Sequence, residues 1–278
     1  MIAIPHNGNL SSGMMFPLVD NFADGEPALD GQYAETRAKW ERLDEVTQSK
    51  GDSEAHPTLS PDDEFADYKT WYWDNLDLSI ANAPAAILDA MERREDYATT
   101  GPRMRLRLFG GWGFESEDAL RRDLADIGYR CGVPMGGDLT RAPTADAVPR
   151  FLIYTLRDPI GADLNRIQIV KGWLDNETGE TMERVYDVVW SGDRAPDQDG
   201  KLPPVGDTVD LSIPSWINTI GASELGTVWQ DPEFDPSERV FYYARLLEIP
   251  TPCWAAYDAV RFGITHEPEV VLKEQGRA

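Results

Sequence analysis

The chain has 278 residues, which is enough for one large domain or two ordinary ones. Apolar residues make up 41% of it and aromatic residues 10%, so the composition supports a packed core and excludes a disordered polypeptide. The formal net charge of -23 excludes the basic surface that nucleic acid or anionic lipid requires, so we expect neither as a partner.

The sequence predicts neither a membrane span nor a signal peptide. No apolar run approaches the roughly 18 residues of a membrane-spanning helix. The N-terminus lacks the basic and apolar regions of a signal peptide, so a cytoplasmic location is the default expectation, and export of full-length relatives stays open. Cys131 and Cys253 fit buried free thiols or one long-range disulfide, and they identify no compartment.

The first hundred residues predict a mixture of helix and strand. Residues 33–42 place their apolar side chains roughly on one face and predict a helix, which a short strand over 43–46 follows. A second helix is expected from Asp62. A third is expected from Asn82, which can cap it, because Pro84 suits the first turn of a helix.

From about residue 103 the pattern changes to strands. Residues 103–108 alternate arginine with apolar residues, which is the period of a half-buried strand. A short helix is expected over 116–127, where Ser116 can act as the N-cap, and the turn residues at 175–179 predict a hairpin. Further strands are predicted at 151–156, 166–174, 184–190 and 240–249.

These elements predict an α+β protein that divides near Thr100. We expect residues 1–99 to form a mixed αβ region and residues 100–278 to form an antiparallel β-sandwich domain.

Two of the three histidines fall in loop-like segments and form the first candidate site. The candidate metal ligands are His6, Glu45, Glu54 and His56. Divalent metals are bound by imidazole and carboxylate groups from several loops, and a catalytic metal activates water. Ordinary loop histidines explain the same pattern equally well.

Three weaker candidates have a structural explanation that we favour. The acidic turn at 193–199 contains alternating aspartates that resemble part of a calcium loop, but the downstream glutamate is missing. The arginines at 103, 105 and 107 are suited to binding an anion, or they form a strand face exposed to solvent. Six tryptophans suit a sugar platform, or core and sheet packing: Trp112, Trp173, Trp190, Trp216, Trp229 and Trp254.

Several runs of this sequence carry a resemblance to a known family. They are 4–9, 45–56, 63–66, 97–103, 166–173, 191–194, 201–206 and 243–250. Because these runs spread over most of the chain, the sequence closely resembles the bacterial domain of unknown function 3604 family. That family is similar to the polymerase-and-histidinol-phosphatase (PHP) metallohydrolases. Those use a distorted α/β barrel with two or three metal ions and typically cleave phosphate esters with metal-activated water.

The resemblance implies roles for the candidate ligands. His6 and His56 would bind a divalent zinc, manganese or iron ion, with Glu45 or Glu54 as a carboxylate ligand or a nearby partner.

The resemblance also implies an architecture. Residues 1–99 would be an incomplete PHP-like α/β barrel portion, and residues 100–278 an appended β-sandwich. Asp193 and Arg194 would then belong to the β domain and not to the metal cluster.

The sequence departs from the family pattern in two places. The first histidine motif of the family has no counterpart before Met1, and a second histidine-containing stretch is missing where 73–76 runs almost directly into Asn82. The C-terminus also ends early, soon after Glu274. A cluster of two or three metals needs roughly six to nine ligands, whereas this chain offers about four. We therefore expect an incomplete site for one metal at most, completed by self-association or by another partner.

The sequence thus predicts a partial member of an uncharacterised PHP-like family that descends from a metal-dependent hydrolase. Phosphate esters are its expected substrate class, the small-molecule substrate itself is unknown, and we expect weak or absent activity for this chain alone. The alternative is a non-catalytic β-sandwich module for binding or structure, because 97–250 carries no catalytic constellation.

Overall fold

The computed structural model describes residues 31–41, 47–48, 51–52, 62–65 and 93–278, the last range without 140–141, 177, 199 and 269. The chain divides into two compact units, Met1–Ala98 and Thr99–Ala278. None of the helices in the described part combines the length and the apolar character that a membrane span needs.

In the first unit, helix α2 spans Gly31–Trp40, so the helix predicted over 33–42 is confirmed with an earlier start and end. An ion pair of 2.6 Å between Arg37 Nε and Glu41 Oε2 supports its last turn. Strands β1 (Thr47–Gln48) and β2 (Gly51–Asp52) pair antiparallel. The predicted strand over 43–46 and the helix from Asn82 lie outside the described residues.

The helix predicted from Asp62 does not begin there. Residues 62–65 form a turn, in which Phe65 N donates to Asp63 Oδ1 at 3.0 Å. An aspartate side chain that accepts from the backbone two residues ahead favours a turn over a helix. The rest of that predicted helix lies outside the described residues.

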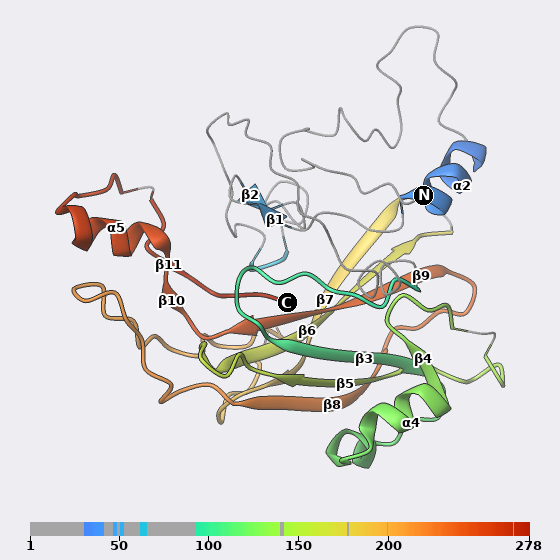
Figure 1. Ribbon diagram of the computed structural model, residues 1–278. Helices are drawn as coiled ribbons and strands as arrows, with labels where there is room; N and C mark the ends of the chain where they lie inside the picture. Colours follow the sequence, from blue (N-terminus) through green and yellow to red (C-terminus); the bar gives the residue numbers. More distant parts are fainter. Residues whose placement is uncertain are drawn as a thin grey trace, which may run out of the picture. The chain divides into compact units, whose positions relative to one another are not determined.

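Two antiparallel sheets form the body of the second unit (Figure 1). The larger sheet has the order β4-β3-β5-β8, with strands Gly132–Pro134, Arg105–Gly111, Arg150–Leu156 and Glu224–Gln230. The smaller sheet has the order β7-β6-β9, with strands Thr181–Trp190, Leu164–Leu174 and Arg239–Glu248. A short pair, β10 (Thr251–Pro252) and β11 (Lys273–Glu274), follows them.

The main core lies between the two sheets, because its buried side chains come from both. The larger sheet contributes Leu106, Leu108, Phe151, Ile153 and Leu225, and the smaller sheet contributes Leu164, Ile167, Ile169 and Leu246. Apolar residues that alternate along facing strands in this way define a sandwich. The coarse prediction of an α+β chain with sandwich-like antiparallel sheets is therefore confirmed. The barrel portion predicted for 1–99 stays a prediction, and the described strands form no closed barrel.

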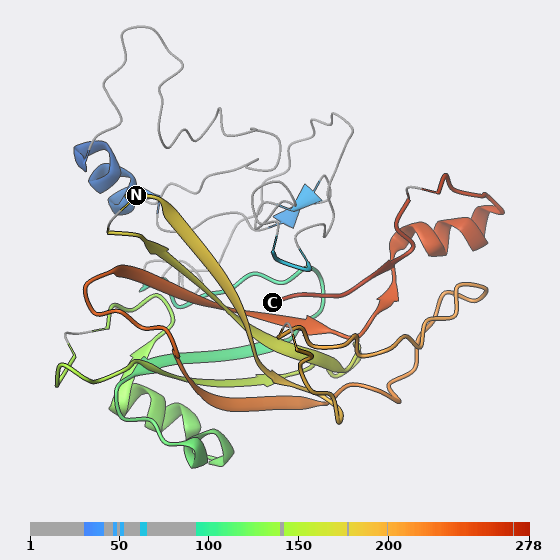
Figure 2. The same ribbon diagram turned by 180° about the vertical axis from the view of Figure 1, so that it is seen from behind.

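The other face of the larger sheet is covered by helices. The 3₁₀ helix η1 (Ser116–Leu120) and helix α4 (Leu124–Cys131) lie against it (Figures 1 and 2). A second cluster packs there, formed by Phe109, Phe114, Ala119, Leu124, Ile127 and Leu152. The outer face of the larger sheet is thus buried in part, while Arg105 and Arg107 of β3 stay exposed on it.

The single helix predicted over 116–127 is wrong, because the segment contains two helices. Glu115, not Ser116, is the N-cap of η1, and it forms a capping box with Asp118. The backbone of Arg121 is extended, and its guanidinium pairs with Asp123 at 2.9 Å, which separates the two helices.

The predicted strands of the second half are confirmed as β3, β5, β6, β7 and β9, and the 175–179 turn joins β6 to β7. Strand β8 and helix α5 (Trp254–Phe262) were not predicted. Both cysteines are free thiols, Cys131 exposed and Cys253 buried, so no disulfide joins them.

Candidate functional site

The predicted metal ligands His6, Glu45, Glu54 and His56 lie outside the described residues. Among the residues that the structure describes, no three histidine, cysteine, aspartate or glutamate side chains come together in a way that could hold a metal ion. The third histidine, His266, has a structural contact: its Nε2 lies 2.9 Å from the carbonyl of Ala255. The prediction of a metal site therefore depends on the sequence alone.

In the described part of the acidic turn at 193–199, Asp197 accepts hydrogen bonds from the backbone of nearby residues. Lys201 N donates to Asp197 Oδ1 at 2.9 Å, and Gly200 N donates to Asp197 O at 3.1 Å. A carboxylate that accepts backbone N–H groups stabilises a turn without a cation. The arginine face also agrees with its structural explanation, because the side chains of Arg103, Arg105 and Arg107 are exposed.

Arg194 is the centre of a hydrogen-bond clamp at one end of the smaller sheet. Its Nη2 donates to Oδ1 of Asn165 at 2.8 Å, its Nη1 to the carbonyl of Pro203 at 2.9 Å, and its Nε to the carbonyl of Ser191 at 3.0 Å. The planar fork of arginine can satisfy several acceptors at fixed angles. Gly192 has a φ of 74°, a left-handed conformation that bends the chain so that Arg194 turns back toward the sheet.

The clamp holds an irregularity in strand β6. The pairing of β6 with β9 shifts between Leu164 and Arg166, so Asn165 is an extra residue in the ladder. Its carbonyl accepts from the backbone N–H and the hydroxyl of Ser191, at 2.9 and 3.1 Å. The motif 191–194 therefore has a structural role in the second unit, where the family resemblance placed Asp193 and Arg194.

The densest polar network of the second unit surrounds Asp231, which follows β8. Its side chain is fully buried, and Oδ2 pairs with Lys171 Nζ at 2.7 Å. Tyr242 donates its hydroxyl to the same oxygen at 2.6 Å, and Glu233 N donates to Oδ1 at 2.9 Å. Burial, followed by the hydrogen bond to Asp231, raises the pKa of Tyr242. Both carboxylate oxygens of Asp231 thus have hydrogen-bond donors, and the residue connects the two sheets.

Glu233 extends this network to the surface. Its backbone carbonyl accepts from Lys171 Nζ at 2.7 Å, while its exposed carboxylate accepts from Arg184 and from Tyr186, the latter at 2.9 Å. Burial raises the pKa of Tyr186, and the hydrogen bond to Glu233 adds to the effect. The loop 231–233 therefore joins β6, β7 and β9 to the end of β8.

Aromatic rings pack beside this network. Trp229 lies 5.0 Å from the ring of Tyr186 and 5.8 Å from that of Phe151, and Phe151 lies 4.5 Å from Tyr242, each measured between centroids. Rings at such centroid distances contact one another by packing. Trp229 is therefore a packing residue, as the structural explanation of the tryptophans expects.

The outer face of the smaller sheet carries a second buried network. Arg166 is 1% exposed and donates from Nη1 to Asp187 Oδ2 at 2.9 Å. Gln168 donates to Asp187 Oδ1 at 2.9 Å and accepts from Arg245 Nε at 3.0 Å. A register shift of β7 places Asp187 directly opposite Gln168, so its carboxylate reaches both partners.

Glu248, at the end of β9, is a buried acid with an altered pKa. Burial, reinforced by the negative charges of Asp158 and Glu274, raises the pKa of Glu248 to about 8. A backbone hydrogen bond from Ala162 opposes that rise, and Oε1 has no hydrogen-bond partner among the described residues. Backbone hydrogen bonds from Arg103 and Ile160 lower the pKa of Asp158, which therefore stays charged beside it.

Sequence reasoning did not single out Lys171, Asp231 or Glu248. Lys171 had a usable signal, because a lysine inside the apolar run 167–173 is unusual for a buried strand and calls for a partner. Asp231 and Glu248 have no comparable local signal, since their partners lie far away in the sequence.

Comparisons with known proteins agree with the resemblance read from the sequence. A family model described as protein of unknown function (DUF3604) matches residues 1–85 and 78–278. No curated protein matches the chain. No solved structure matches it either.

Proposed function

The chain belongs to the protein family of unknown function DUF3604, and from this premise we propose that it is the remnant of a metal-dependent hydrolase whose second unit is a non-catalytic β-sandwich module. The metal site belongs to the first unit, and phosphate esters are its expected substrate class. The second unit has a binding role or a structural role.

The observation that supports the module is the way the second unit uses its buried charges. Lys171 pairs with Asp231, and Arg166 pairs with Asp187, so these two buried cations each have a carboxylate partner within the sandwich. Catalytic groups, in contrast, need an open position toward substrate. These networks are of the kind that rigidifies a fold.

The support for the hydrolase half comes from the sequence. His6 and His56 stand in the loops that resemble the ligand loops of PHP metallohydrolases, and Glu45 and Glu54 add carboxylates. A divalent metal held there would lower the pKa of a bound water. The two segments matched by the family model overlap at 78–85, next to the place where a stretch of the family pattern is missing. That agreement supports an incomplete site with weak or absent activity.

Metal analysis of the purified full chain tests this proposal. After loading with zinc or manganese and dialysis, we expect about one divalent ion per chain, since the retained ligands suffice for one metal. His6→Ala and His56→Ala should each weaken the metal affinity at least about tenfold, because losing only the hydrogen-bond partner of a ligand already costs that much, and should leave less metal bound after dialysis. The matched control is His266→Gln, because His266 contacts the carbonyl of Ala255 and should leave metal content unchanged.

Hydrolysis of phosphomonoester and phosphodiester substrates gives the second readout. We expect rates near background for the loaded chain. Turnover at ordinary enzyme rates that disappears in His6→Ala would refute weak activity, and a wild-type chain without any bound metal would refute the remnant site.

A further inference from the structure

Exposed apolar side chains concentrate in one part of the second unit, the segment 254–271 between β10 and β11. Trp254 is 61% exposed, Phe262 63% and Val271 63%. The other exposed apolar residues of the segment are Tyr257, Val260, Ile264 and Val270. A concentration of exposed apolar side chains marks an interaction site more often than scattered ones do.

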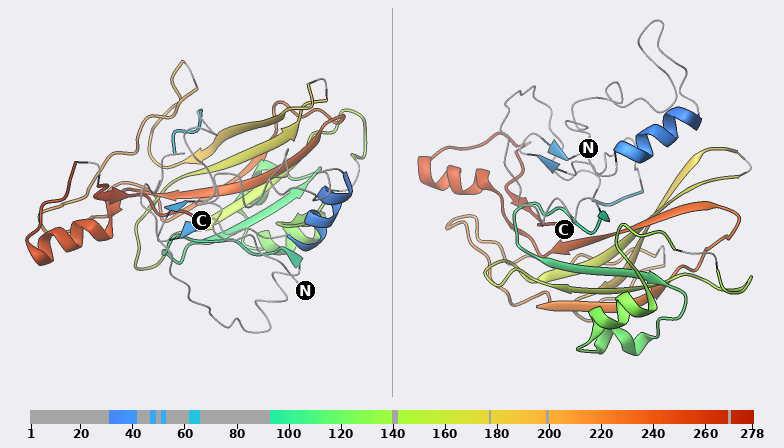
Figure 3. Two further views of the ribbon diagram at one scale, coloured as in Figure 1. Left: turned by 90° about the horizontal axis from the view of Figure 1, so that it is seen from above. Right: turned by 45° about the vertical axis from the view of Figure 1, so that its right-hand side comes forward.

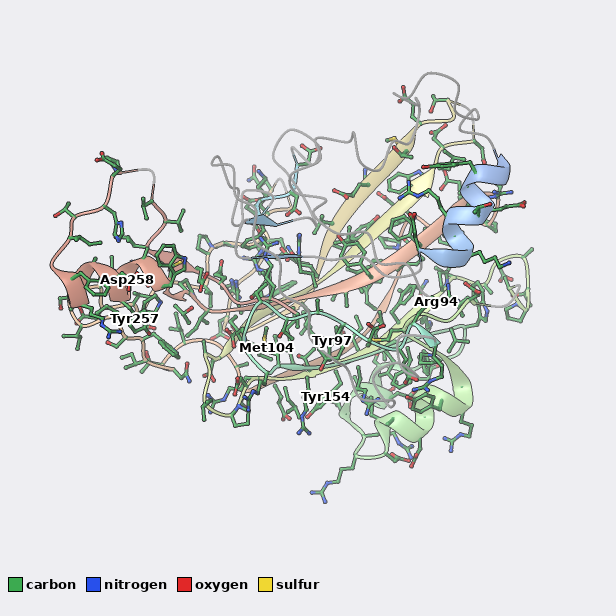
Figure 4. The ribbon with its side chains drawn as sticks, turned by 45° about the horizontal axis from the view of Figure 1, so that its top comes forward. Arg94, Tyr97, Met104, Tyr154, Tyr257 and Asp258 are labelled. Carbon is green, nitrogen blue, oxygen red and sulfur yellow. The ribbon has the colours of Figure 1, made fainter. Side chains whose placement is uncertain are left out.

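Helix α5 presents most of this surface. Its buried residues Ala255 and Ala256 lie toward the body of the unit, while Trp254, Tyr257 and Arg261 follow the i, i+3, i+7 spacing of the opposite face. The helix stands clear of both sheets of its unit (Figures 1 and 3), and Figure 4 shows Tyr257 and Asp258 on it.

The segment has a defined structure. Gly263 ends α5 in a left-handed conformation with a φ of 61°, and Ile264 N donates to Ala259 O at 3.1 Å. His266 Nε2 lies 2.9 Å from the carbonyl of Ala255, and Cys253 N donates to Leu272 O at 2.9 Å. The backbone that carries the apolar side chains is therefore ordered before binding, which lowers the entropy cost of binding.

The charges on α5 suggest which partner fits. Helix α5 carries one acid, Asp258, which is half-buried, and one base, Arg261, which is exposed. The whole chain, in contrast, has 49 acidic and 26 basic residues. Because each copy carries a net charge of -23, two copies repel each other at long range, and a place with balanced local charge is where this repulsion is weakest. When two such helices pack antiparallel, the acid of each helix lies opposite the base of the other. The charges of α5 are therefore complementary to those of a second copy.

We propose that α5 is a self-association surface, on which two copies of this chain pack their α5 helices antiparallel across a twofold axis. The reversed order places Asp258 of each copy opposite Arg261 of the other. A parallel pairing would oppose each charge with its like, which is unfavourable. This inference does not depend on the proposed hydrolase descent.

The exposed area is of the size that a modest dimer needs. Seven partly exposed apolar residues, three of them aromatic, offer on the order of 600 Å² per copy, somewhat below the roughly 800 Å² of a standard interface. We therefore expect a dissociation constant of about 1–50 µM.

Sedimentation equilibrium of the full chain between about 1 and 200 µM measures this association. The double variant Trp254→Ser with Phe262→Ser should raise the dissociation constant at least about tenfold. The matched control is Leu120→Ser with Ile160→Ser, which removes two side chains of the same unit that are 84% and 86% exposed and lie outside the segment. This control should leave the constant unchanged.

The charge pair tests the antiparallel geometry without altering the apolar surface. Asp258→Arg and Arg261→Asp should each weaken self-association about fivefold or more, because each places like charges together twice. An equimolar mixture of the two variants should associate as tightly as wild type, since their charges are complementary. A wild-type chain that stays monomeric at 200 µM would overturn the proposal. So would a Leu120→Ser, Ile160→Ser control that weakens association as much as the Trp254→Ser, Phe262→Ser variant does. A mixture of the two charge variants that associates more weakly than wild type would also overturn it.

Discussion

At the scale of single residues, Glu248 shows how the fold changes the chemistry of a side chain. An unfolded glutamate has a pKa of about 4.3. In the fold, burial and the nearby charges of Asp158 and Glu274 raise the pKa to about 8, and the Ala162 N–H is the opposing influence. Glu248 is 2% exposed, and it lies beside the C-terminal residues of the chain, because its backbone N–H donates to Gly276 O at 2.9 Å.

This raised pKa predicts a pH dependence of stability. Between about pH 4 and pH 8 the folded state binds a proton at Glu248 that the unfolded state has released, so stability falls as the pH rises through this window. A shift of this size corresponds to a loss of about 5 kcal/mol as an upper bound. Glu248→Gln, which imitates the neutral acid, should be more stable than wild type at pH 8 and nearly equal to it at pH 4.5.

Urea unfolding from pH 4.5 to 9 measures this difference. Because the chain is acid-rich, only the difference between variant and wild type isolates the residue. Glu180→Gln, a change at an exposed glutamate of the β6–β7 turn, is the control and should show no such trend. A difference between Glu248→Gln and wild type that is constant across this pH range would contradict the assignment.

At the scale of elements, Lys171 and Asp231 connect the two sheets. Lys171 lies in β6 of the smaller sheet, and Asp231 follows β8 of the larger one, with both side chains buried. Lys171→Met removes one charge and leaves the other buried, a change that typically costs about 3–5 kcal/mol. We therefore expect a loss of that size in the free energy of unfolding, measured by urea denaturation.

The matched control is another lysine of the same unit. Lys273 pairs with Asp207 at the surface, and its side chain is 39% exposed, so Lys273→Met should cost about 1 kcal/mol or less. Replacing Asp231 by Leu in the Lys171→Met background should recover part of the loss, because it removes the unpaired charge. A Lys171→Met variant as stable as the Lys273→Met control would show that the pair does not hold the sheets together.

The elements also differ in how well the sequence predicted them. Strand β3 was predictable because its arginines and leucines alternate, and the alternation reflects one exposed and one buried face. Strand β8 was missed because Gly226 and Thr227 interrupt its apolar pattern, and its place is set by pairing with β5. The break between η1 and α4 falls at the extended residue Arg121, which a periodic pattern does not reveal.

At the scale of the whole molecule, the second unit contains the contacts that close it. The backbone N–H of Thr100 donates to Arg277 O at 3.1 Å, and Arg277 N donates to Thr100 Oγ1 at 2.9 Å, so the first and last residues of the unit meet. Ala278 and Leu246 exchange both backbone hydrogen bonds. A unit whose two ends are joined and whose core is its own can fold independently.

We therefore predict that Thr99–Ala278, expressed alone, unfolds in one cooperative transition. Circular dichroism and intrinsic tryptophan fluorescence should report the same midpoint, which is the test of two-state behaviour. The matched control is a shorter piece that ends at Lys273, because it loses the segment that pairs with β9 and should be clearly less stable. Aggregation of Thr99–Ala278, or transitions that differ between the two probes, would show that the module needs the first unit.

The sequence by itself determined the features that depend on neighbouring residues: the long strands, the 175–179 turn, the acidic charge and the family. It also predicted the four metal ligands, which remain a prediction. Only the tertiary structure decided the buried pairs and the pKa of Glu248, because Lys171 and Asp231, or Glu248 and Asp158, lie 60 or more residues apart in the chain. Burial and electrostatic coupling arise from neighbours in space, and these become neighbours only when the two sheets pack together.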